Sequence, residues 1–224
     1  DATGTPIRCT QNPTMGEEWR RGWHPEKVAS SKNKEPVLIV GAGPAGLEAA
    51  MTLGRRGVPV MLADANDKFG GRINLESRLP GLAEWARVRD WRLHQLSKLA
   101  NVEQFPASRM MRDDCLSTGA RHIIVATGSK WRADGRGLSA PAGVASYSDA
   151  RTLTPDDIMQ GRRGEGPYVI FDDEAYYMAS VLAELLAREG AEVAVVSSSG
   201  RVGSWMAHTV EQERAQALLI ELGV

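Results

Sequence analysis

The 224-residue chain has few cysteines, no excess of either charge and no long apolar run. Its two cysteines exclude a disulfide-stapled scaffold and fit a reducing compartment. The net charge of −1, from 27 basic and 28 acidic residues, argues against binding of nucleic acid by bulk electrostatics. Aliphatic runs reach only about four residues, far short of the ~20 of a membrane helix. These absences leave an α/β protein expected to be soluble and cytoplasmic, with no nucleic-acid or membrane partner.

From Pro36 onward, short apolar runs alternate with segments of helical period. This alternation predicts Rossmann-like βαβ units with parallel sheets joined by right-handed crossovers. The chain begins at Asp1 without methionine and stops just after a helical pattern, so the fold is expected to be incomplete at both ends. The predicted strands are 37–40, 58–63, 122–126, 168–171 and 192–196, and those at 37–40 and 122–126 are expected to be buried. The predicted helices are 47–56, 82–99, 175–188 and 208–222.

Three domains are expected from these changes of pattern. Residues 1–35 show no sustained period and are rich in Gly, Pro, Lys, Arg and Trp, which indicates an arm or linker or, equally, a locally ordered extension. Residues 36–130 form a partial dinucleotide-binding domain of the ADP/FAD type. Residues 131–224, reached by a loop-like crossing over 133–166, form a second, partial NAD(P)-like domain with a degenerate glycine motif.

The strongest chemical motif is the turn GAGPAG at 41–46, between a predicted strand and a predicted helix. A pyrophosphate binds backbone N–H groups at a helix N-terminus, where the helix dipole favours negative charge. Gly41 permits the tight turn, Gly43 lets the backbone approach the phosphates, and Gly46 lets helix pack on strand. Pro44 suits the first helical turn, where its missing N–H costs nothing, and Ala45 follows it. The alternative is a tight strand-to-helix turn with no ligand.

Residues after the next two strands extend this candidate nucleotide site. Asp64 lies 23 residues after Gly41, close to the ~20 expected for a carboxylate that binds a ribose hydroxyl, and it would repel a 2′-phosphate. The run FGGR at 69–72 allows the chain to pass over an adenosine, and its arginine could meet a phosphate or be an ordinary solvated side chain. The predicted cofactor-binding residues beyond the 41–46 turn are Asp64, Ala65, Gly71, Arg72, Ala126, Thr127 and Gly128.

The second predicted domain lacks such a turn. After the strand at 168–171 the sequence reads DDEAYY, with no glycine and with three carboxylates where a pyrophosphate would lie. Each unit charge pair at ~5 Å would repel by about 3 kcal/mol at an effective dielectric constant of ~20. The sequence therefore predicts that this domain does not bind NAD(P)H in the usual manner, and that the carboxylates lie at the start of the following helix. The run SSSGR at 197–201 is interpreted as a polar loop rather than a 2′-phosphate loop.

Several runs together resemble the trimethylamine dehydrogenase family, which includes the dimethylamine and histamine dehydrogenases and is related to the 2,4-dienoyl-CoA reductases. The similarity spans nearly all of the chain. Its most specific parts are the block around Cys9 and the glycine-poor second nucleotide motif, and both favour the amine dehydrogenases. The runs are RCTQNP (8–13), GEE (16–18), WHPE (23–26), VLIVGAGPAG (37–46), PGL (80–82), EW (84–85), IVATG (124–128) and YYMA (176–179).

The resemblance implies a parent with an FMN-bearing (β/α)₈ barrel, a [4Fe–4S] cluster and two nucleotide-type domains. Such a parent oxidises an amine at the FMN and passes electrons through the cluster to an external carrier such as an electron-transfer flavoprotein. Cys9 matches the fourth cluster ligand, but one thiolate does not hold a cluster that needs four. Neither FMN nor a cluster is therefore expected in this chain, which contains no recognisable catalytic residues.

Three functions remain open from the sequence. The first is the ADP-binding part of an iron–sulfur flavoprotein amine dehydrogenase, an oxidoreductase acting on C–N bonds, with ADP as a structural nucleotide. The second is an NAD(P)H-dependent flavoprotein reductase domain of the 2,4-dienoyl-CoA reductase type. The third is an adenine-nucleotide module without a redox role. The glycine-poor run 171–177 speaks against the second function, and ADP is favoured over the ADP half of FAD by resemblance alone.

Overall fold

The computed structural model describes residues 15–16, 19, 28–32, 34–144 and 151–224. They form two compact units. The first contains the described residues up to Ser77 together with Glu84–Ser129, and the second contains Arg78–Ala83 and Lys130–Val224. Most of the expected arm at 1–35 lies outside the described residues, so the domain limits derived from the sequence stay predictions.

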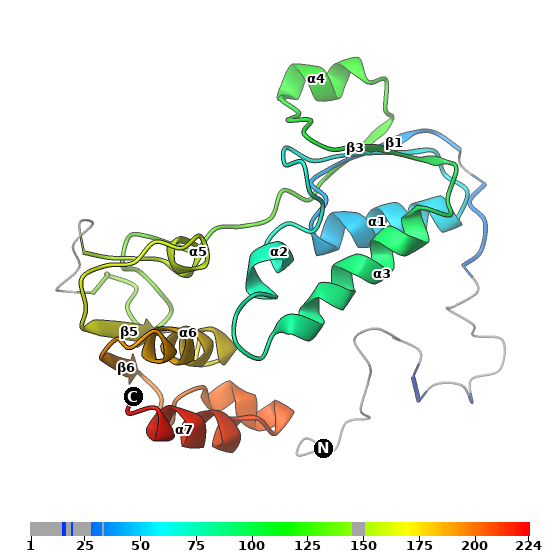
Figure 1. The fold of residues 1–224 in the computed structure, drawn as a ribbon. Helices are drawn as coiled ribbons and strands as arrows, with labels where there is room; N and C mark the ends of the chain where they lie inside the picture. Colours follow the sequence, from blue (N-terminus) through cyan, green and yellow to red (C-terminus); the bar gives the residue numbers. More distant parts are fainter. Residues whose placement is uncertain (1–14, 17–18, 20–27, 33, 145–150) are drawn as a thin grey trace. The chain divides into compact units, whose positions relative to one another are not determined.

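The first unit is built on a four-stranded parallel sheet (Figure 1). Its strand order is β3-β2-β1-β4, the order expected when crossovers lead outward from a central first strand. In the register, Val40 lies beside both Ala63 and Val125, so three strands end at one level. The α/β fold with parallel strands is thus confirmed. The strands are β1 (Val37–Val40), β2 (Val60–Ala63), β3 (Val102–Phe105) and β4 (His122–Val125).

Two helices cover one face of this sheet and close the main core. Helix α1 (Pro44–Arg55) contributes Leu47 and Ala50, which are fully buried against Ile39 and Leu62 of the strands. Helix α3 (Ala86–Leu96) adds Leu96 to the same cluster. Figure 1 shows the short helix α4 on the opposite side of the sheet. The shorter helices are α2 (Ile73–Glu76), the 3₁₀ turn η1 (Ala83–Trp85) and α4 (Arg112–Ser117).

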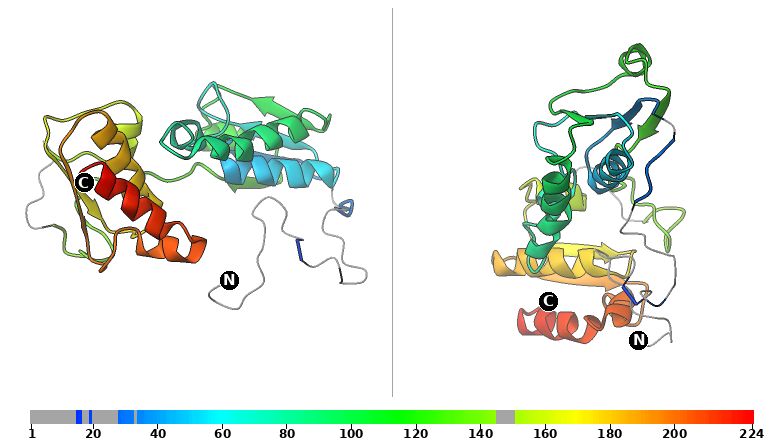
Figure 2. Two further views of the ribbon diagram at one scale, coloured as in Figure 1. Left: turned by 60° about the horizontal axis from the view of Figure 1, so that its bottom comes forward. Right: turned by 90° about the vertical axis from the view of Figure 1, so that its right-hand side faces the viewer.

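The second unit is a two-stranded parallel sheet with its own small core. Ala183 and Leu186 of α6, Val193 of β6 and Leu219 of α7 form a buried apolar cluster. Figure 2 shows α6 and α7 side by side. The elements are α5 (Pro155–Met159), β5 (Tyr168–Asp172), α6 (Tyr177–Arg188), β6 (Val193–Ser197), the 3₁₀ helix η2 (Ser204–Thr209) and α7 (Gln212–Glu221).

Several elements differ from the sequence predictions. The strand predicted to be buried at 122–126 is β4, an edge strand whose Val125 is 73% exposed, because helices α1 and α3 cover only the other face. The helix predicted at 208–222 is divided into η2 and α7 by Val210, which has a left-handed backbone with φ 63°. Ala175 has φ 53°, so α6 begins two residues later than predicted.

Other elements have different limits from the predicted ones or were not predicted at all. Helix α1 begins at Pro44, three residues early, and the segment 82–99 divides into η1 and α3. Strand β3, with the polar residues Glu103 and Gln104, was not predicted, and neither were α2 and α4. Helix α5 interrupts the segment 133–166 that was expected to be a loop. The capping box between Thr154 and Asp157 could have indicated the start of this helix from the sequence.

Candidate functional site

The turn between β1 and α1 requires glycine at two positions for reasons internal to the protein. Gly41 has φ 104°, and a Cβ there would overlap the carbonyl of Ala126. A Cβ on Gly46 would overlap the carbonyl oxygen of Gly41. Glycine is needed at both positions because backbone segments approach each other closely. The packing alone therefore explains Gly41 and Gly46, whether or not a ligand binds.

Gly43 is different because its own packing does not require a glycine. It precedes α1 with φ −73°, a conformation open to any residue, and the nearest atom to a Cβ there would be Gly71 Cα at 4.0 Å. Pro44 occupies the first position of the helix, and no side chain in the described part of the protein caps this N-terminus. The turn thus presents a helix N-terminus beside open space, the arrangement that suits a phosphate group.

Asp64 follows β2 and is buried, with 7% of its surface exposed. Its Oδ2 accepts a hydrogen bond from the Ala42 N–H at 2.6 Å. Its Oδ1 accepts from the backbone N–H of Asn66 at 2.8 Å and from Asn66 Nδ2 at 2.9 Å. A carboxylate offers about four lone-pair positions, so roughly one on Oδ2 remains for a ribose hydroxyl. Through its bond to Ala42, Asp64 also holds the glycine turn directly, which the sequence did not predict. Ala65, the next residue, is exposed.

The second glycine turn, at 69–72, returns to the first one. Gly70, with φ 123°, donates its N–H to the carbonyl of Ala42 at 2.8 Å. A Cβ on Gly71 would lie 3.0 Å from Gly43 Cα, so the two glycine turns are in close contact. Arg72 donates from Nη2 to the carbonyl of Ser129 at 2.6 Å and pairs with Glu76 at 3.7 Å. Arg72 therefore ties this turn to the segment after β4, and its contact with a phosphate stays a prediction.

The segment after β4 completes the carboxyl edge of the sheet. Ala126 donates its N–H to the Val40 carbonyl at 2.7 Å, and its own carbonyl lies against Gly41. A Cβ on Gly41 would lie 3.0 Å from Thr127 Cα, while Gly128 faces open space. Ligands of open α/β sheets bind at this edge. The structure thus brings together the predicted residues of the 41–46 turn with Asp64, Gly71, Arg72, Ala126 and Thr127.

Sequence reasoning missed the residues that hold these loops in place. Asn66 could have been found, because an Asp-x-Asn run commonly forms a turn in which the aspartate accepts from the backbone two residues on. Ser129 contributes only its carbonyl, which carries no sequence signal. Asn74 bonds to the Phe69 carbonyl and to Arg89, and its contact with Arg89 forms only through the tertiary structure.

In the second unit the corresponding turn follows β5, and its carboxylates are used by the protein. Asp172 is only 2% exposed, and its Oδ1 accepts from the Ala175 N–H at 2.8 Å. Its Oδ2 has no hydrogen-bond partner among the described residues, and burial raises the pKa of this carboxyl. The expectation that the carboxylates lie in the first turn of the helix is wrong, because α6 begins only at Tyr177.

Asp173 points to another part of the same unit. Its carboxylate accepts from the Leu138 N–H at 2.6 Å, from the Ser139 N–H at 2.7 Å and from the Ser139 hydroxyl. Burial opposes the charged form, but the hydrogen bonds from Ser139 and Leu138 outweigh it and lower the pKa of Asp173. The side chain therefore clamps the loop at 137–139, and only Glu174 of the three carboxylates is exposed.

The loop after β6 lies against the start of α6. Trp205 donates its N–H to the Ala175 carbonyl at 2.9 Å. A Cβ on Gly203 would lie 3.2 Å from the Tyr176 carbonyl oxygen and 3.5 Å from Ser180 Oγ. The backbone of 203–205 thus packs beside the helix start, where a dinucleotide would need access.

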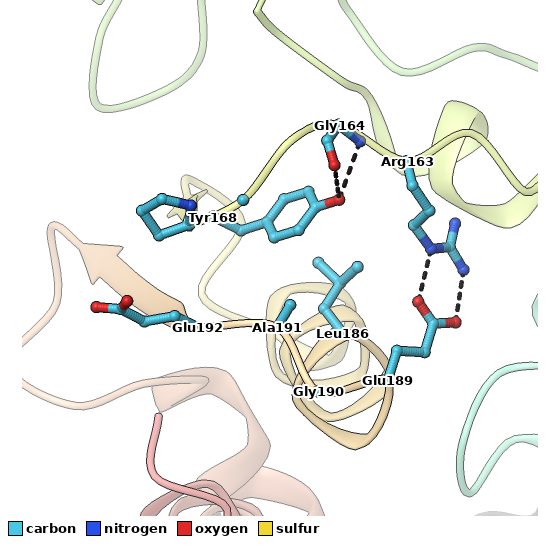
Figure 3. A pocket seen from close by; sticks show the side chains of 10 residues that line it. Arg163, Gly164, Tyr168, Leu186, Glu189, Gly190, Ala191 and Glu192 are labelled. Carbon is cyan, nitrogen blue, oxygen red and sulfur yellow. Dashed lines mark hydrogen bonds and ion pairs between the residues drawn. The ribbon is translucent and has the colours of Figure 1, made fainter.

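A cavity of about 500 Å³ lies at the opposite, amino-terminal edge of β5 and β6 (Figure 3). Three of its four polar side chains, those of Arg163, Tyr168 and Glu189, already bind protein groups. Arg163 forms a paired ion contact with Glu189 at 2.7 and 2.8 Å, and the Tyr168 hydroxyl bonds to the N–H and carbonyl of Gly164 at 2.9 and 2.8 Å. These three side chains are therefore already engaged within the protein, and the cavity lies away from the edge where α/β sheets bind ligands.

Cys9, the predicted cluster ligand, lies outside the described residues. Within the described part of the chain, no three His, Cys, Asp or Glu side chains come together as metal ligands. Among the same residues, every helix is too short or too polar to cross a membrane.

The fold and the glycine turn place the first unit in the class of Rossmann-like nucleotide-binding domains. The profile of the NAD(P)-binding Rossmann-like domain matches residues 39–110. The profile of the OYE-like second alpha/beta domain matches residues 153–224.

Individual relatives match the chain over nearly its whole length. The dimethylamine dehydrogenase of Hyphomicrobium sp. (strain x) is 43% identical over 99% of this chain and 31% of its own length. The histamine dehydrogenase of Rhizobium sp. 4-9 is 44% identical with a TM-score of 0.89, over 100% of this chain and 33% of its own. The 6-hydroxypseudooxynicotine amine oxidase of Pseudomonas geniculata N1 has 44% identity and a TM-score of 0.92, over 100% of this chain and 34% of its own.

The resemblance to the trimethylamine dehydrogenase family indicated by the motifs is therefore confirmed, since the chain is similar over nearly its whole length to a dimethylamine dehydrogenase and a histamine dehydrogenase. The chain spans about a third of the length of these relatives.

Proposed function

We propose that the first unit binds ADP as a structural nucleotide, and that the chain is the nucleotide-binding portion of an iron–sulfur flavoprotein amine dehydrogenase, an oxidoreductase acting on C–N bonds. The observation that carries the ADP site is Gly43. Its packing would accept a side chain, yet the position lies at the start of α1 beside open space. A glycine that the fold does not need is explained if a phosphate approaches the backbone there.

The residues around Gly43 fit an adenine nucleotide. The N-terminus of α1 supplies backbone N–H groups and the positive end of the helix dipole for the pyrophosphate. Asp64 keeps roughly one lone pair for a ribose hydroxyl, and its negative charge disfavours a 2′-phosphate. These residues bind and orient the nucleotide; none of them is placed to move a proton or an electron pair.

The amine chemistry belongs to the parent protein in this proposal. By family resemblance, an FMN barrel and a [4Fe–4S] cluster would supply the redox chemistry, with Cys9 as one cluster ligand. A single thiolate does not fit a four-iron cluster, so no step is assigned to such a cluster in this chain. In this proposal the partners of the chain are the FMN barrel domain of the parent and an electron-transfer flavoprotein.

The decisive experiment is a calorimetric titration of ADP into the full 224-residue chain and its Gly43→Ala variant, each first freed of co-purified nucleotide. We expect the added methyl group to block phosphate approach and to weaken binding at least about tenfold, which corresponds to about 1.4 kcal/mol. Thermal unfolding should be nearly unchanged, because the methyl group meets only Gly71 Cα at 4.0 Å. Gly200→Ala, with no neighbour within 4 Å of the new Cβ and located in the second unit, is the matched control.

Equal ADP affinity in wild type and Gly43→Ala would contradict the proposal that a phosphate binds at this turn. Asp64→Ala in the same titration should weaken binding by roughly 1–3 kcal/mol, the usual loss for a hydrogen bond to a charged group. Purified protein that is yellow would favour FAD and the reductase alternative. Colourless protein that releases ADP on heating would favour the structural nucleotide.

A further inference from the structure

We propose that Asn74 and Arg89 form a positioning pair that holds the second glycine turn against the first and so sets the affinity of the nucleotide site. This inference rests on the proposed function of the first unit. Neither side chain belongs to the glycine motifs or to the predicted cofactor-binding residues.

Asn74, in α2, binds the turn at 69–71 through its Nδ2 and binds Arg89 through its Oδ1. Its Nδ2 donates to the Phe69 carbonyl at 3.1 Å and lies 3.5 Å from the Lys68 carbonyl. Its Oδ1 accepts from Arg89 Nη1 at 2.7 Å. The same Oδ1 occupies the space that a Cβ on Gly70 would need, so the amide is packed directly against the glycine turn.

Arg89 connects this amide to a rigid part of the fold. It lies on α3, whose Leu96 is fully buried in the main core with Leu93 packed beside it. Its Nε also pairs with Asp90 at 2.7 Å, and three-quarters of its side chain is covered, since 26% is exposed. The guanidinium is therefore held in place and fixes the orientation of the Asn74 amide, with Nδ2 toward the carbonyls.

The turn at 69–71 contacts the backbone of the 41–46 turn, where the proposal places the pyrophosphate. Gly70 donates its N–H to the Ala42 carbonyl at 2.8 Å, inside the 41–46 turn. Gly71 lies close enough to Gly43 that a Cβ on it would come within 3.0 Å of Gly43 Cα. A shift of the second turn would thus move the wall facing Gly43, where the proposal places the pyrophosphate. Binding sites need such supporting contacts to keep their geometry to within about 0.5 Å.

The test compares two identical substitutions in the same unit. Asn74→Asp keeps the acceptor for Arg89 but turns the donor to Phe69 into an acceptor facing a carbonyl. Asn101→Asp is the matched control, because Asn101 Nδ2 likewise donates to two carbonyls, of Gly54 at 3.0 Å and Val58 at 2.7 Å, but away from the glycine turns. Both variants should be less resistant to urea. Only Asn74→Asp should bind ADP more weakly, by about 3- to 30-fold.

A second pair tests the arginine. Arg89→Gln should weaken ADP binding and also speed amide hydrogen exchange at Gly70, whose N–H bonds to Ala42. Arg92→Gln, on the same helix, removes the ion pair with Glu48 at 2.8 Å and should change neither quantity.

The results separate this inference from the proposed function. Wild-type protein that does not bind ADP would overturn both. Wild-type binding with equal affinity in Asn74→Asp and Arg89→Gln would overturn the positioning role alone. Equal losses of affinity in Asn74→Asp and Asn101→Asp would also overturn it, because the effect would then follow general stability.

Discussion

The two units place different chemistry at the same position, the turn between a strand and the helix that follows it. In the first unit this turn contains glycines, keeps open space beside Gly43 and leaves the N-terminus of α1 without a side-chain cap from the described residues. In the second unit Asp172 and Asp173 bind neighbouring backbone, and the segment 203–205 packs beside the start of α6. The comparison shows that one βα turn can leave open space at the start of its helix or be filled by internal structural contacts, depending on which groups lie there.

The largest effect expected from this comparison is on folding of the first unit. Gly46→Ala should lower the free energy of unfolding by about 3 kcal/mol or more, because the new Cβ would overlap the Gly41 carbonyl oxygen and the backbone would have to move. Urea denaturation followed by circular dichroism measures the loss. Gly200→Ala in the second unit should stay within about 0.5 kcal/mol of wild type. Equal stability of both variants would contradict the packing described for the 41–46 turn.

A smaller effect is expected from the clamp in the second unit. Asp173→Ala removes the acceptor for Leu138 and Ser139 and should lower stability by roughly 1–3 kcal/mol at pH 7. The pKa of Asp173 is lowered in the folded protein, so its contribution is present above the unfolded value of about 3.9 and is lost as pH falls through the folded pKa. The difference between variant and wild type should therefore shrink in acid, as measured by urea denaturation at several pH values.

Asp172→Asn is the contrasting control for that clamp. The pKa of Asp172 is raised by burial, so the folded state favours the protonated side chain and ionisation costs stability as pH rises through the folded pKa. An asparagine keeps an acceptor for the Ala175 N–H and carries no charge, so it should not destabilise the unit near neutral pH. A large loss at pH 7 would show that the charged carboxylate is needed there.

The smallest effect is expected for the nicotinamide cofactor. NADH titrated into the chain should show no binding at the second unit, because the protein's own residues fill the place beside α6. Fluorescence or calorimetric titration measures this directly. A saturable NADH site that is lost on substitution of 197–201 would reverse the distinction between the two units.

The sequence predicted the first turn well because its constraints are local. The spacing from Gly41 to Gly46, between an apolar strand and a helix, is enough to indicate a nucleotide turn, and Asp64 follows at the expected distance. The supporting contacts could not be predicted in the same way. Arg89 meets Asn74 only through the packing of α3, and Asp173 meets Ser139 across 34 positions. Such contacts depend on tertiary structure and leave no periodic pattern in the chain.

Burial was also beyond the reach of the sequence pattern. The apolar residues of β1 and β4 look alike in the chain, and both strands were predicted to be buried, yet Ile39 is fully buried and Val125 is mostly exposed. The difference comes from the position of β4 at the sheet edge and from which face the helices cover.

The segment 203–205 has a consequence for protein engineering. Introducing glycines into the run after β5 would not by itself create a dinucleotide pocket, because the Trp205 backbone would still be bonded to Ala175. A designer would have to rebuild two stretches about thirty positions apart together, and each change alone would remove a contact without opening a cavity.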